Sequence, residues 1–410
     1  MAGAYPYGVQ LASSGMNIST LPAASIWADT CAIDARQFRG LANQTLPFQI
    51  DDPLADVLYD VGLGSSNGSQ IVVDIKAFMK SLGDRPFYSR SMLRHAADQL
   101  SRARNGLRIT LTDCYGAKRV YPARDLSLPS QDFSLGYNGL HLLATAQSAP
   151  QGDHFSLDDM LPIYVRVGKK AKETTNLYDR VLQKVRMQNF ERLWQWTPPR
   201  HILFDSLNRL KHTARITNIV CIGLGTLQMS DPRRANPTMQ HIVASSIAQD
   251  LERIYEAEGT PVDTPITIIA QDPAYDELDR RALLDLPVPI KIVSDPEGFL
   301  AINESSLVFS SYPAVPVKQL VADLSSEAPD GKGPAALFVN RNPLEKAHGD
   351  VNLIRYDWDI ERPYTDPHTS DYLRMLESYT QVFDGERLFG EGFRLTMPTS
   401  NGRDYVPGYE

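Results

Sequence analysis

Residues 218–232, with the sequence NIVCIGLGTLQMSDP, contain the turn that decides the fold. An apolar run ends there in two glycines, Gly223 and Gly225. A helix is expected to begin at Asn236 and Pro237, because Asn is a favoured N-cap and Pro suits the first helical position. A continuous apolar run is typical of a strand that is buried on both faces. The stretch therefore predicts a buried strand, a glycine turn and then a helix.

The same alternation continues on the C-terminal side of this turn. Further apolar runs alternate with segments of helical character as far as residue 340. Short strands that alternate with helices form βαβ units, which predict a parallel sheet with helices on both faces. We therefore expect a Rossmann-like α/β domain over residues 214–345. Its five strands are expected at residues 216–222, 265–271, 289–294, 306–311 and 335–340.

Three other parts are expected around this domain. They are an N-terminal α+β region at residues 1–160, a basic helical connector at 161–213 and a C-terminal tail at 346–410. In the first part, residues 1–50 are expected to be irregular. Ser89 fits the N-cap of a helix that Gly106 ends. The tail is expected to contain one helix, at residues 368–383.

The connector carries an excess of positive charge. Residues 166–215 hold 12 Lys and Arg against 4 Asp and Glu, within a chain of net charge −8. We expect this surface to dock on the acidic remainder of the chain, and the alternative is an anionic partner. A helix is expected at roughly 170–196, with the apolar pattern of an amphipathic helix. Its apolar stripe is formed by Leu177, Val181 and Val185, and its end is thickened by Phe190, Leu193, Trp194 and Trp196.

The composition limits the classes of function. A net charge of −8 over 410 residues argues against general binding of nucleic acids. The three cysteines show neither a zinc spacing nor a disulfide framework, and a reducing compartment fits them best. No signal-peptide pattern and no apolar run long enough for a membrane span are present, so no membrane association is expected. We expect a cytoplasmic protein with access to the nucleus.

Glycines and polar residues follow three of the predicted strands. In doubly wound sheets, ligands bind outside the carboxyl ends of the strands. Glycines there let backbone N–H groups approach a ligand, and an acid after the second strand commonly binds a ribose hydroxyl. A small-molecule or cofactor site is therefore expected at this edge. Its candidate residues are Gly223, Gly225, Thr226, His241, Asp272, Asp295 and Glu297.

A competing interpretation is that the glycines form a tight turn that serves packing alone. The full GxGxxG motif is missing, since Gln228 stands where the third glycine would be. Asp272 follows Gly223 by 49 positions, whereas dinucleotide-binding enzymes place the acid about 20 residues on. No zinc-protease, nucleophile-elbow or P-loop motif is present, so the sequence names no metal site, no catalytic residue and no cofactor. Both interpretations of the turn stay open.

Several short motifs in the predicted domain carry a family resemblance. They are IVCIGLGTL at 219–227, the helix start at Gln240 and His241, IIAQDPAYDELD at 268–279 and DPEGFLAI at 295–302. With these motifs, residues 214–342 resemble the Sensitivity-to-Red-light-Reduced family, and PFYSRSMLRHAADQL at 86–100 is similar to its fungal members. The resemblance implies a protein of cytosol and nucleus that acts in light and circadian signalling, haem-linked regulation or microtubule-related stress.

One departure limits what the resemblance transfers. Many family members have Pro-His-Cys after the fourth strand, where this chain has Tyr312, Pro313, Ala314 and Val315. We expect a regulatory or accessory protein that binds a small ligand or a protein partner in a Rossmann-like cleft. The alternative is an enzyme of fungal specialised metabolism that uses a nucleotide-containing or methyl-donor cofactor in the same cleft. The sequence leaves open whether the protein is catalytic.

Overall fold

The computed structural model describes residues 70–83, 85–121, 131–148, 160–169, 177–227, 237–259, 264–340, 353–357, 365–384 and 393–398. The chain divides into two compact units, Met1–Gln49 and Ile50–Glu410, and every described residue belongs to the second. The irregular structure predicted for residues 1–50 therefore lies outside the described residues.

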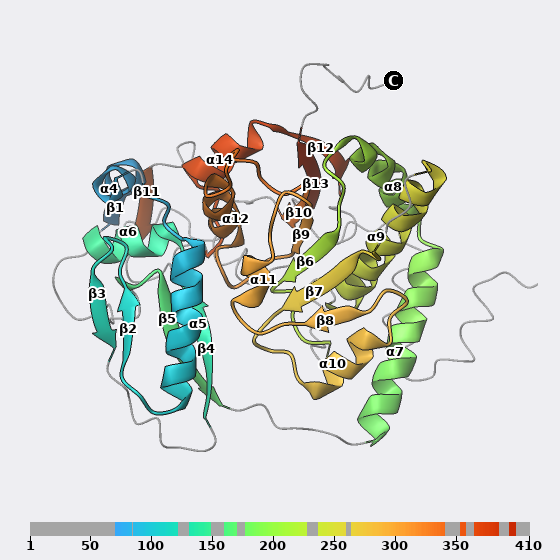
Figure 1. The fold of residues 1–410 in the computed structure, drawn as a ribbon, viewed down its shortest axis with the longest axis horizontal. Helices are drawn as coiled ribbons and strands as arrows, with labels where there is room; N and C mark the ends of the chain where they lie inside the picture. The colour runs from blue at the N-terminus through green and yellow to red at the C-terminus, as the bar shows by residue number, and fades with distance from the viewer. Residues whose placement is uncertain are drawn as a thin grey trace, which may run out of the picture. The chain divides into compact units, whose positions relative to one another are not determined.

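The main feature of the second unit is a seven-stranded sheet (Figure 1). Five of its strands are parallel to one another and coincide with the five predicted strands. They are β6 (Asn218–Ile222), β7 (Thr267–Gln271), β8 (Ile290–Ile292), β9 (Ser306–Ser310) and β10 (Ala336–Asn340). Every residue of β9 and β10 is buried, as the continuous apolar runs predict. The predicted Rossmann-like, mainly parallel sheet is confirmed.

The strand order creates a switch point between β6 and β9. Numbered along the chain, the five parallel strands lie in the order 3-2-1-4-5, which matches the first five strands of the Rossmann order 3-2-1-4-5-6. The chain passes from β6 to β7 on one side and then returns to β9 on the other side of β6. Sheets of this kind bind ligands beyond the carboxyl ends of the strands at such a point. Here that place lies beyond Ile222 and Ser310, which are paired across β6 and β9.

Two strands from the C-terminal part extend the sheet beyond β10. β13 (Phe393–Pro398) pairs antiparallel with β10, and β12 (Tyr379–Asp384) pairs antiparallel with β13. The single helix predicted at 368–383 is therefore wrong in its second half, because α14 (Ser370–Leu376) ends before β12. The physical reason is burial of Val382 and Phe383 against the sheet, where the Phe383 ring lies edge-on to Phe338 at 5.9 Å.

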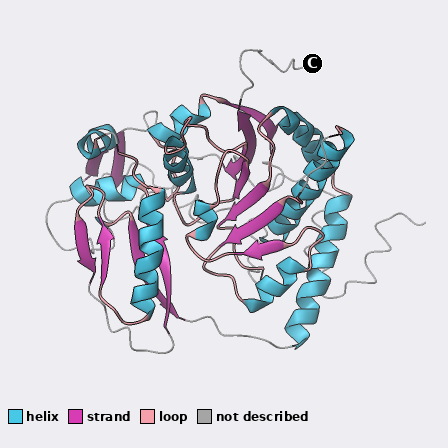
Figure 2. Ribbon diagram, in the orientation of Figure 1, coloured by secondary structure: helices cyan, strands magenta, loops and turns pink. Residues whose placement is uncertain are grey.

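Helices cover both faces of the sheet (Figure 2). Alternate strand residues serve the two faces, so that Ile219 and Cys221 belong to one core and Val220 and Ile222 to the other. The first core includes residues of α7 (Leu177–Gln195), α8 (Pro198–Leu207), η2 (Asn208–His212), α9 (Pro237–Ala257) and α10 (Glu277–Leu284). The second core includes residues of α11 (Glu297–Leu300), α12 (Val317–Ser326) and α14.

The N-terminal α+β region shares this second core. Two antiparallel pairs, β2 with β3 and β4 with β5, form most of its strands. Its elements are β1 (Gln70–Asp74), α4 (Ile75–Leu82), α5 (Arg90–Arg104), β2 (Ile109–Thr112), β3 (Lys118–Tyr121), β4 (Gln131–Tyr137), α6 (Leu140–Ser148) and β5 (Ile163–Lys169). The strand β5 lies in the segment predicted as the helical connector and pairs with β4. Ser89 caps α5 as predicted, since its side chain accepts a hydrogen bond of 3.1 Å from the Met92 N–H.

The tail also contributes to this region. β11 (Leu353–Asp357) pairs antiparallel with β1, so the first described strand and a segment of the predicted tail form one small sheet. The Tyr88 N–H donates a 2.8 Å hydrogen bond to Asp323 of α12, which links the α+β region to the helices on the large sheet. The predicted boundaries near residues 160, 213 and 345 remain predictions.

The predicted apolar face of α7 is confirmed for Trp194 and wrong for Val181 and Val185. Val181 and Val185 are 55 % and 47 % exposed, whereas Met187 and Trp194, on the opposite side of the helix, are buried against the sheet domain. The apolar spacing of this helix offers two stripes, and the larger Met and Trp side chains fill the space beside α9. Among the described residues, none of the helices combines the length and the apolarity that a membrane crossing requires.

Candidate functional site

The two predicted glycines lie in the turn at the carboxyl end of β6. Gly223 has a φ of +66° and Gly225 a φ of +79°, a backbone region that residues with a Cβ adopt only with strain. The Gly223 N–H donates a 3.0 Å hydrogen bond to the Gln271 carbonyl of β7, which continues the ladder between the two strands. Local backbone geometry therefore explains both glycines.

Asp272 binds this turn directly. The Gly225 N–H donates a hydrogen bond of 2.8 Å to Asp272 Oδ2, and the Ala274 N–H donates one of 2.8 Å to Oδ1. The carboxylate therefore occupies the place where a glycine turn would hold an anionic ligand group. A phosphate at Gly225 would have to displace a side chain of the same charge.

Asp295 lies at the same edge and is bound by two groups from other elements. The Tyr137 hydroxyl at the end of β4 donates a hydrogen bond to Asp295 Oδ1, and Gln271 Nε2 donates a second of 2.9 Å to the same oxygen. Gln271 Oε1 in turn accepts a hydrogen bond of 2.7 Å from the Gly298 N–H. Within the described part of the chain, Asp295 Oδ2 accepts no hydrogen bond and is thus open to a further donor.

Burial raises the pKa of both acids. Removal from water raises the pKa of Asp295 to about 7, and the nearby charge of Asp272 contributes in the same direction, against the lowering effect of the Tyr137 hydrogen bond. Burial also raises the pKa of Asp272, while its two backbone hydrogen bonds lower it. Asp295 is therefore partly protonated at neutral pH, and the charge of Asp272 contributes to this rise in its pKa.

His241 forms a neutral, fully buried contact near this pair. A carbonyl can only accept, so His241 Nδ1 donates to the Pro237 carbonyl at 2.6 Å. Its Nε2 therefore accepts from the Tyr275 hydroxyl, also at 2.6 Å. Burial lowers the pKa of His241 to about 4, which keeps the ring neutral at physiological pH. Burial raises the pKa of the Tyr275 hydroxyl, and the charge of Asp272 raises it further. Asp272 therefore acts electrostatically on the hydroxyl that donates to His241.

The two remaining predicted residues have different roles. The Thr226 hydroxyl donates a 2.8 Å hydrogen bond to Asp279, a residue that also closes the capping box at the start of α10. Thr226 thus fixes the turn to α10 and does not point a free group at a ligand. Glu297 begins the short helix α11 and is exposed, and among the described residues its side chain forms no hydrogen bond or ion pair with the other candidate residues.

The loop after β9 lies against the glycine turn at the switch point, where Pro313 approaches Gly223. A Cβ added to Gly223 would lie 3.1 Å from the Cβ of Pro313, so the glycine allows this loop to approach. Tyr312 has a φ of +47°, and its N–H donates a 3.1 Å hydrogen bond to Asn340. The hydroxyl of Ser311 is buried and has no hydrogen-bond partner in the described structure.

Tyr137, Gln271, Tyr275 and Asp279 were not among the predicted residues. Gln271, Tyr275 and Asp279 lie within the family-like motif at 268–279, which was the available signal for them. Tyr137 had no such signal, because it reaches Asp295 over 158 positions of sequence. No group of three His, Cys, Asp or Glu among the described residues could hold a metal ion.

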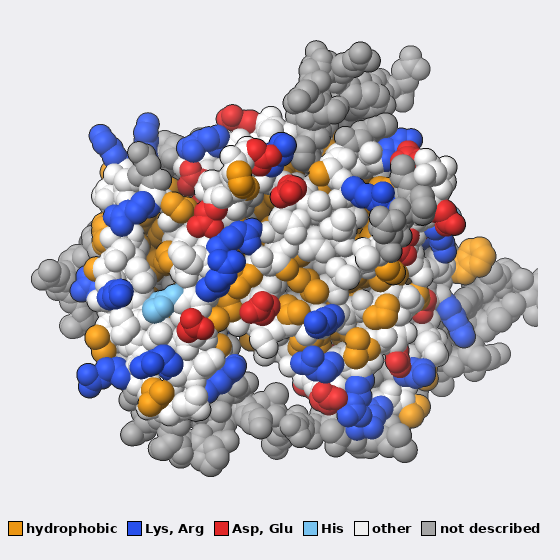
Figure 3. Space-filling model, in the orientation of Figure 1, with side chains coloured by type: hydrophobic (Ala, Val, Ile, Leu, Met, Phe, Trp, Pro, Cys, Tyr) orange, Lys and Arg blue, Asp and Glu red, His pale blue; other side chains and the backbone are white. Residues whose placement is uncertain are grey.

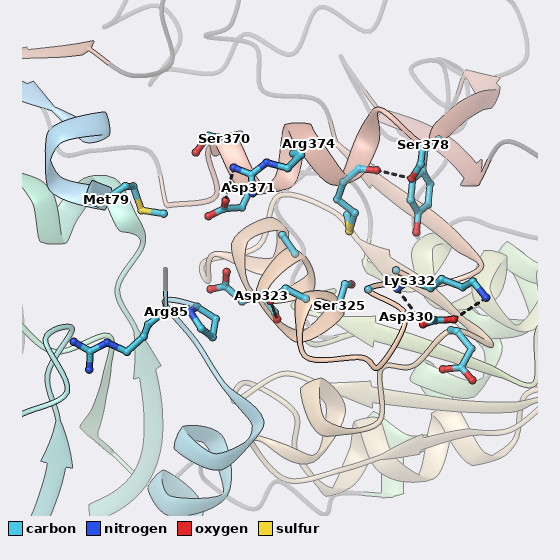
Figure 4. A pocket seen from close by; sticks show the side chains of 18 of the residues that line it. Met79, Arg85, Asp323, Ser325, Asp330, Lys332, Ser370, Asp371, Arg374 and Ser378 are labelled. Atoms are coloured by element: carbon cyan, nitrogen blue, oxygen red, sulfur yellow. Dashed lines mark hydrogen bonds and ion pairs between the residues drawn. The ribbon is translucent and has the colours of Figure 1, made fainter. Parts of the chain in front are cut away.

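A groove of about 1230 Å³ lies at the opposite edge of the sheet (Figure 4). Residues that precede the strands, such as Ala214, Glu304 and Ala335, line it, and none of the seven predicted site residues does. Ion pairs of 2.6 Å between Lys332 and Asp330 and of 3.3 Å between Arg374 and Asp371 lie within it. Its walls carry charges of both signs and thus favour no single class of ligand.

Comparison with known proteins identifies a family for the sheet domain. Residues 191–378 match the SRR1 domain, and this range includes the motifs at the carboxyl edge described above. No curated protein and no solved structure gave a match to the chain. An SRR1 domain supports, at a general level, a regulatory or accessory protein. The match confirms the resemblance seen in the sequence, and residues 191–378 of this chain are an SRR1 domain.

Proposed function

We propose that the SRR1 domain binds a small ligand rich in hydrogen-bond donors at the carboxyl edge of its sheet. The chain acts through this site as a regulatory or accessory protein. The observation that carries the proposal is the coupled pair of Asp272 and Asp295 beside the switch point, with Asp295 Oδ2 open to a donor. A buried acid without charged partners is costly to retain, and ligand donors would offset part of this cost.

The charge of the pair selects the class of ligand. Asp272 fills the backbone N–H position at Gly225 that a phosphate would need. Cations, amines and hydroxyls would gain from both carboxyl groups, whereas phosphates and carboxylates would be repelled. The buried hydroxyl of Ser311 at the end of β9 adds a polar group that a ligand could satisfy.

The test is thermal stabilisation of the full chain by a panel of nucleosides, nucleotides, S-adenosylmethionine and porphyrins. Asp272→Asn keeps the shape of the side chain and removes its charge, and Asp285→Asn, at a surface position 67 % exposed, is the matched control. We expect a donor-rich compound to stabilise the wild type and the control, and Asp272→Asn to weaken its binding at least tenfold. Gly225→Val is unsuitable, because the φ of +79° would strain any other residue. Equal stabilisation of the wild type and Asp272→Asn, or selective stabilisation by inorganic phosphate, would refute the proposal.

A second candidate function is an enzyme that uses a methyl-donor cofactor. The observation that favours it is the complete strand order, 3-2-1-4-5-7-6 along the chain, in which the seventh strand, β13, runs antiparallel to both neighbours. Doubly wound sheets of this kind bind cofactors at the switch point, although a shared fold alone does not establish an activity. S-Adenosylmethionine carries a sulfonium cation, an ammonium group, ribose hydroxyls and an adenine amine, which suit an acidic site, and its single carboxylate would have to lie away from Asp272 and Asp295. Stabilisation by S-adenosylmethionine but not by ATP would support this candidate, and the reverse preference would exclude it.

A further inference from the structure

Asp295 differs from the other described acids whose pKa is raised by burial. Asp250 and Asp366 pair with a cation, with Arg200 at 2.7 Å and with Lys318 at 3.3 Å. Three more acids accept hydrogen bonds on both carboxyl oxygens, namely Asp272, Asp279 and Asp323. Within the described part of the chain, Asp295 alone in this set has neither a cation nor a hydrogen bond on its second oxygen.

Two donors fix the orientation of this carboxyl group. The Tyr137 hydroxyl and Gln271 Nε2 both donate to its Oδ1. The Gln271 amide cannot turn, because its Oε1 accepts a 2.7 Å hydrogen bond from the Gly298 N–H, which can only donate. The Tyr137 ring packs against Tyr88 and Phe299, with ring centroids 6.4 and 5.3 Å away. Since Oδ1 accepts both bonds, a proton that the carboxyl group takes up lies on Oδ2.

The groups that face Asp295 supply no positive charge. Asp272, after the neighbouring strand β7, carries the charge that acts on Asp295. Tyr137 contributes a neutral hydroxyl, and Glu297 on α11 is an exposed acid. Lys and Arg side chains are spread over the face that Figure 3 shows, yet none of the described ones forms an ion pair with Asp295 or Asp272. A cation is therefore the group that this edge of the sheet lacks.

We propose that the ligand binds Asp295 Oδ2 through an ammonium group, which displaces the proton from this oxygen. The inference rests on the ligand site proposed above at the carboxyl edge. Part of the Asp295 surface remains exposed, so a small ligand can reach it. An ammonium group has three donors and no acceptor, and the charges of Asp295 and Asp272 both attract it. One proton passes to solvent for each ammonium group bound, and a neutral carboxyl group is replaced by an ion pair.

Proton release makes the affinity depend on pH. Burial, with a contribution from the charge of Asp272, raises the pKa of Asp295 to about 7. Below this pH an ammonium ligand has to expel the proton, whereas above it the carboxylate is already charged. An amine that stays protonated throughout should therefore bind about tenfold more tightly at pH 8 than at pH 6. A neutral hydroxyl ligand binds without this exchange.

The test is isothermal titration calorimetry of the full chain with putrescine, which carries two ammonium groups. The matched neutral probe is its dihydroxy analogue. Titrations in two buffers with different heats of protonation give the number of protons released. At pH 6 putrescine should release about one proton per bound molecule, and the diol none. Asp295→Asn should weaken putrescine binding at pH 8 about tenfold or more, and Asp285→Asn, at a position 67 % exposed, should leave it unchanged.

Tyr137→Phe tests whether the geometry at Oδ1 sets the response. The Tyr137 hydrogen bond lowers the pKa of Asp295, so its loss should move the midpoint of the pH dependence of putrescine binding to higher pH. A merely structural defect would weaken binding at every pH and leave the midpoint in place. Tyr379→Phe, which removes a hydrogen bond to the Pro334 carbonyl, should not move the midpoint. Circular dichroism confirms that each variant is folded.

The outcomes separate this inference from the proposed ligand site. Equal affinity for putrescine at pH 6 and pH 8, or binding without proton release, would overturn the inference. Equal binding to the wild type and Asp295→Asn would assign putrescine to the acidic surface at large. Stabilisation by a neutral compound of the panel without any binding of putrescine would overturn the inference and leave the proposed site standing. If neither probe binds and no compound of the panel stabilises the chain, both fail.

Discussion

The Tyr137 hydroxyl donates a hydrogen bond to the Asp295 carboxylate and so joins strand β4 to the carboxyl edge of the seven-stranded sheet. The Tyr137 ring also lies edge-on to Phe299 of α11, with ring centroids 5.3 Å apart. Burial and the charge of Asp295 raise the pKa of the Tyr137 hydroxyl well above its ordinary value, which keeps the hydroxyl protonated as a donor. The N-terminal α+β region thus supplies a group to the candidate site of the SRR1 domain.

Tyr137→Phe should keep the ring packing and remove the donor to Asp295. We expect a loss of about 1–2 kcal/mol in the free energy of unfolding, measured by urea denaturation. The pKa of Asp295 should rise further, since the Tyr137 hydrogen bond lowers it. Tyr379→Phe is the control, because it removes a 2.6 Å hydrogen bond to the Pro334 carbonyl away from this site. An Asp295 carboxyl resonance that titrates identically in wild type and Tyr137→Phe would contradict the assignment.

Asp295→Asn should flatten the dependence of stability on pH. The pKa of Asp295 is about 7 in the folded chain, and that of an unfolded Asp is about 4. Between these values the folded chain retains a proton that the unfolded chain has lost, so stability falls as pH rises. The wild type should therefore lose up to about 1 kcal/mol more per pH unit than Asp295→Asn between pH 5 and 7. Parallel stability curves for the two proteins would refute the raised pKa.

His241 should remain neutral well below the ordinary pKa of histidine. Nitrogen NMR of the imidazole is expected to show a protonated Nδ1 and an unprotonated Nε2 down to about pH 5, because burial lowers the pKa of His241 to about 4. Tyr275→Phe would leave Nε2 without its donor and should cost about 1–3 kcal/mol of unfolding free energy. Exposed His201, for which no comparable burial exists, is the internal control. Protonation of His241 near pH 6.5 would show that the contact is absent.

Lys318 and Asp366 form a buried ion pair that fixes the C-terminal part to α12. Lys318 Nζ lies 3.3 Å from Asp366 Oδ2 and donates a 3.0 Å hydrogen bond to the Asp366 carbonyl. Lys318→Met alone should cost about 3–5 kcal/mol, because it leaves the buried Asp366 carboxylate without its charged partner. Lys318→Met combined with Asp366→Leu should recover most of this loss. Additive effects of the two substitutions in a double-mutant cycle would argue against a direct pair.

The candidate site could be predicted in part. Glycines after the first strand and acids after the second and third are local sequence features, and parallel strands bring their carboxyl ends to one edge. The structure does bring Gly225 to Asp272 at 2.8 Å, and it couples Asp272 electrostatically to Asp295. It assigns Thr226 to the capping of α10 and leaves Glu297 exposed at the start of α11. Whether a ligand binds there stays a prediction.

The sequence by itself determined the five parallel strands, because apolar runs of strand length between helical segments permit no other regular arrangement with short connections. Tertiary structure decided which surfaces meet. Helix α7 has two apolar stripes. Met187 and Trp194 are buried beside α9, whereas Val181 and Val185 are exposed. The periodicity of the helix does not predict which stripe is buried, because that depends on the space beside α9. Likewise, β12 and β13 join the sheet, and Tyr137 reaches Asp295, through contacts between residues far apart in sequence. Such contacts stabilise the protein only once the chain is folded, so no local sequence pattern predicts them.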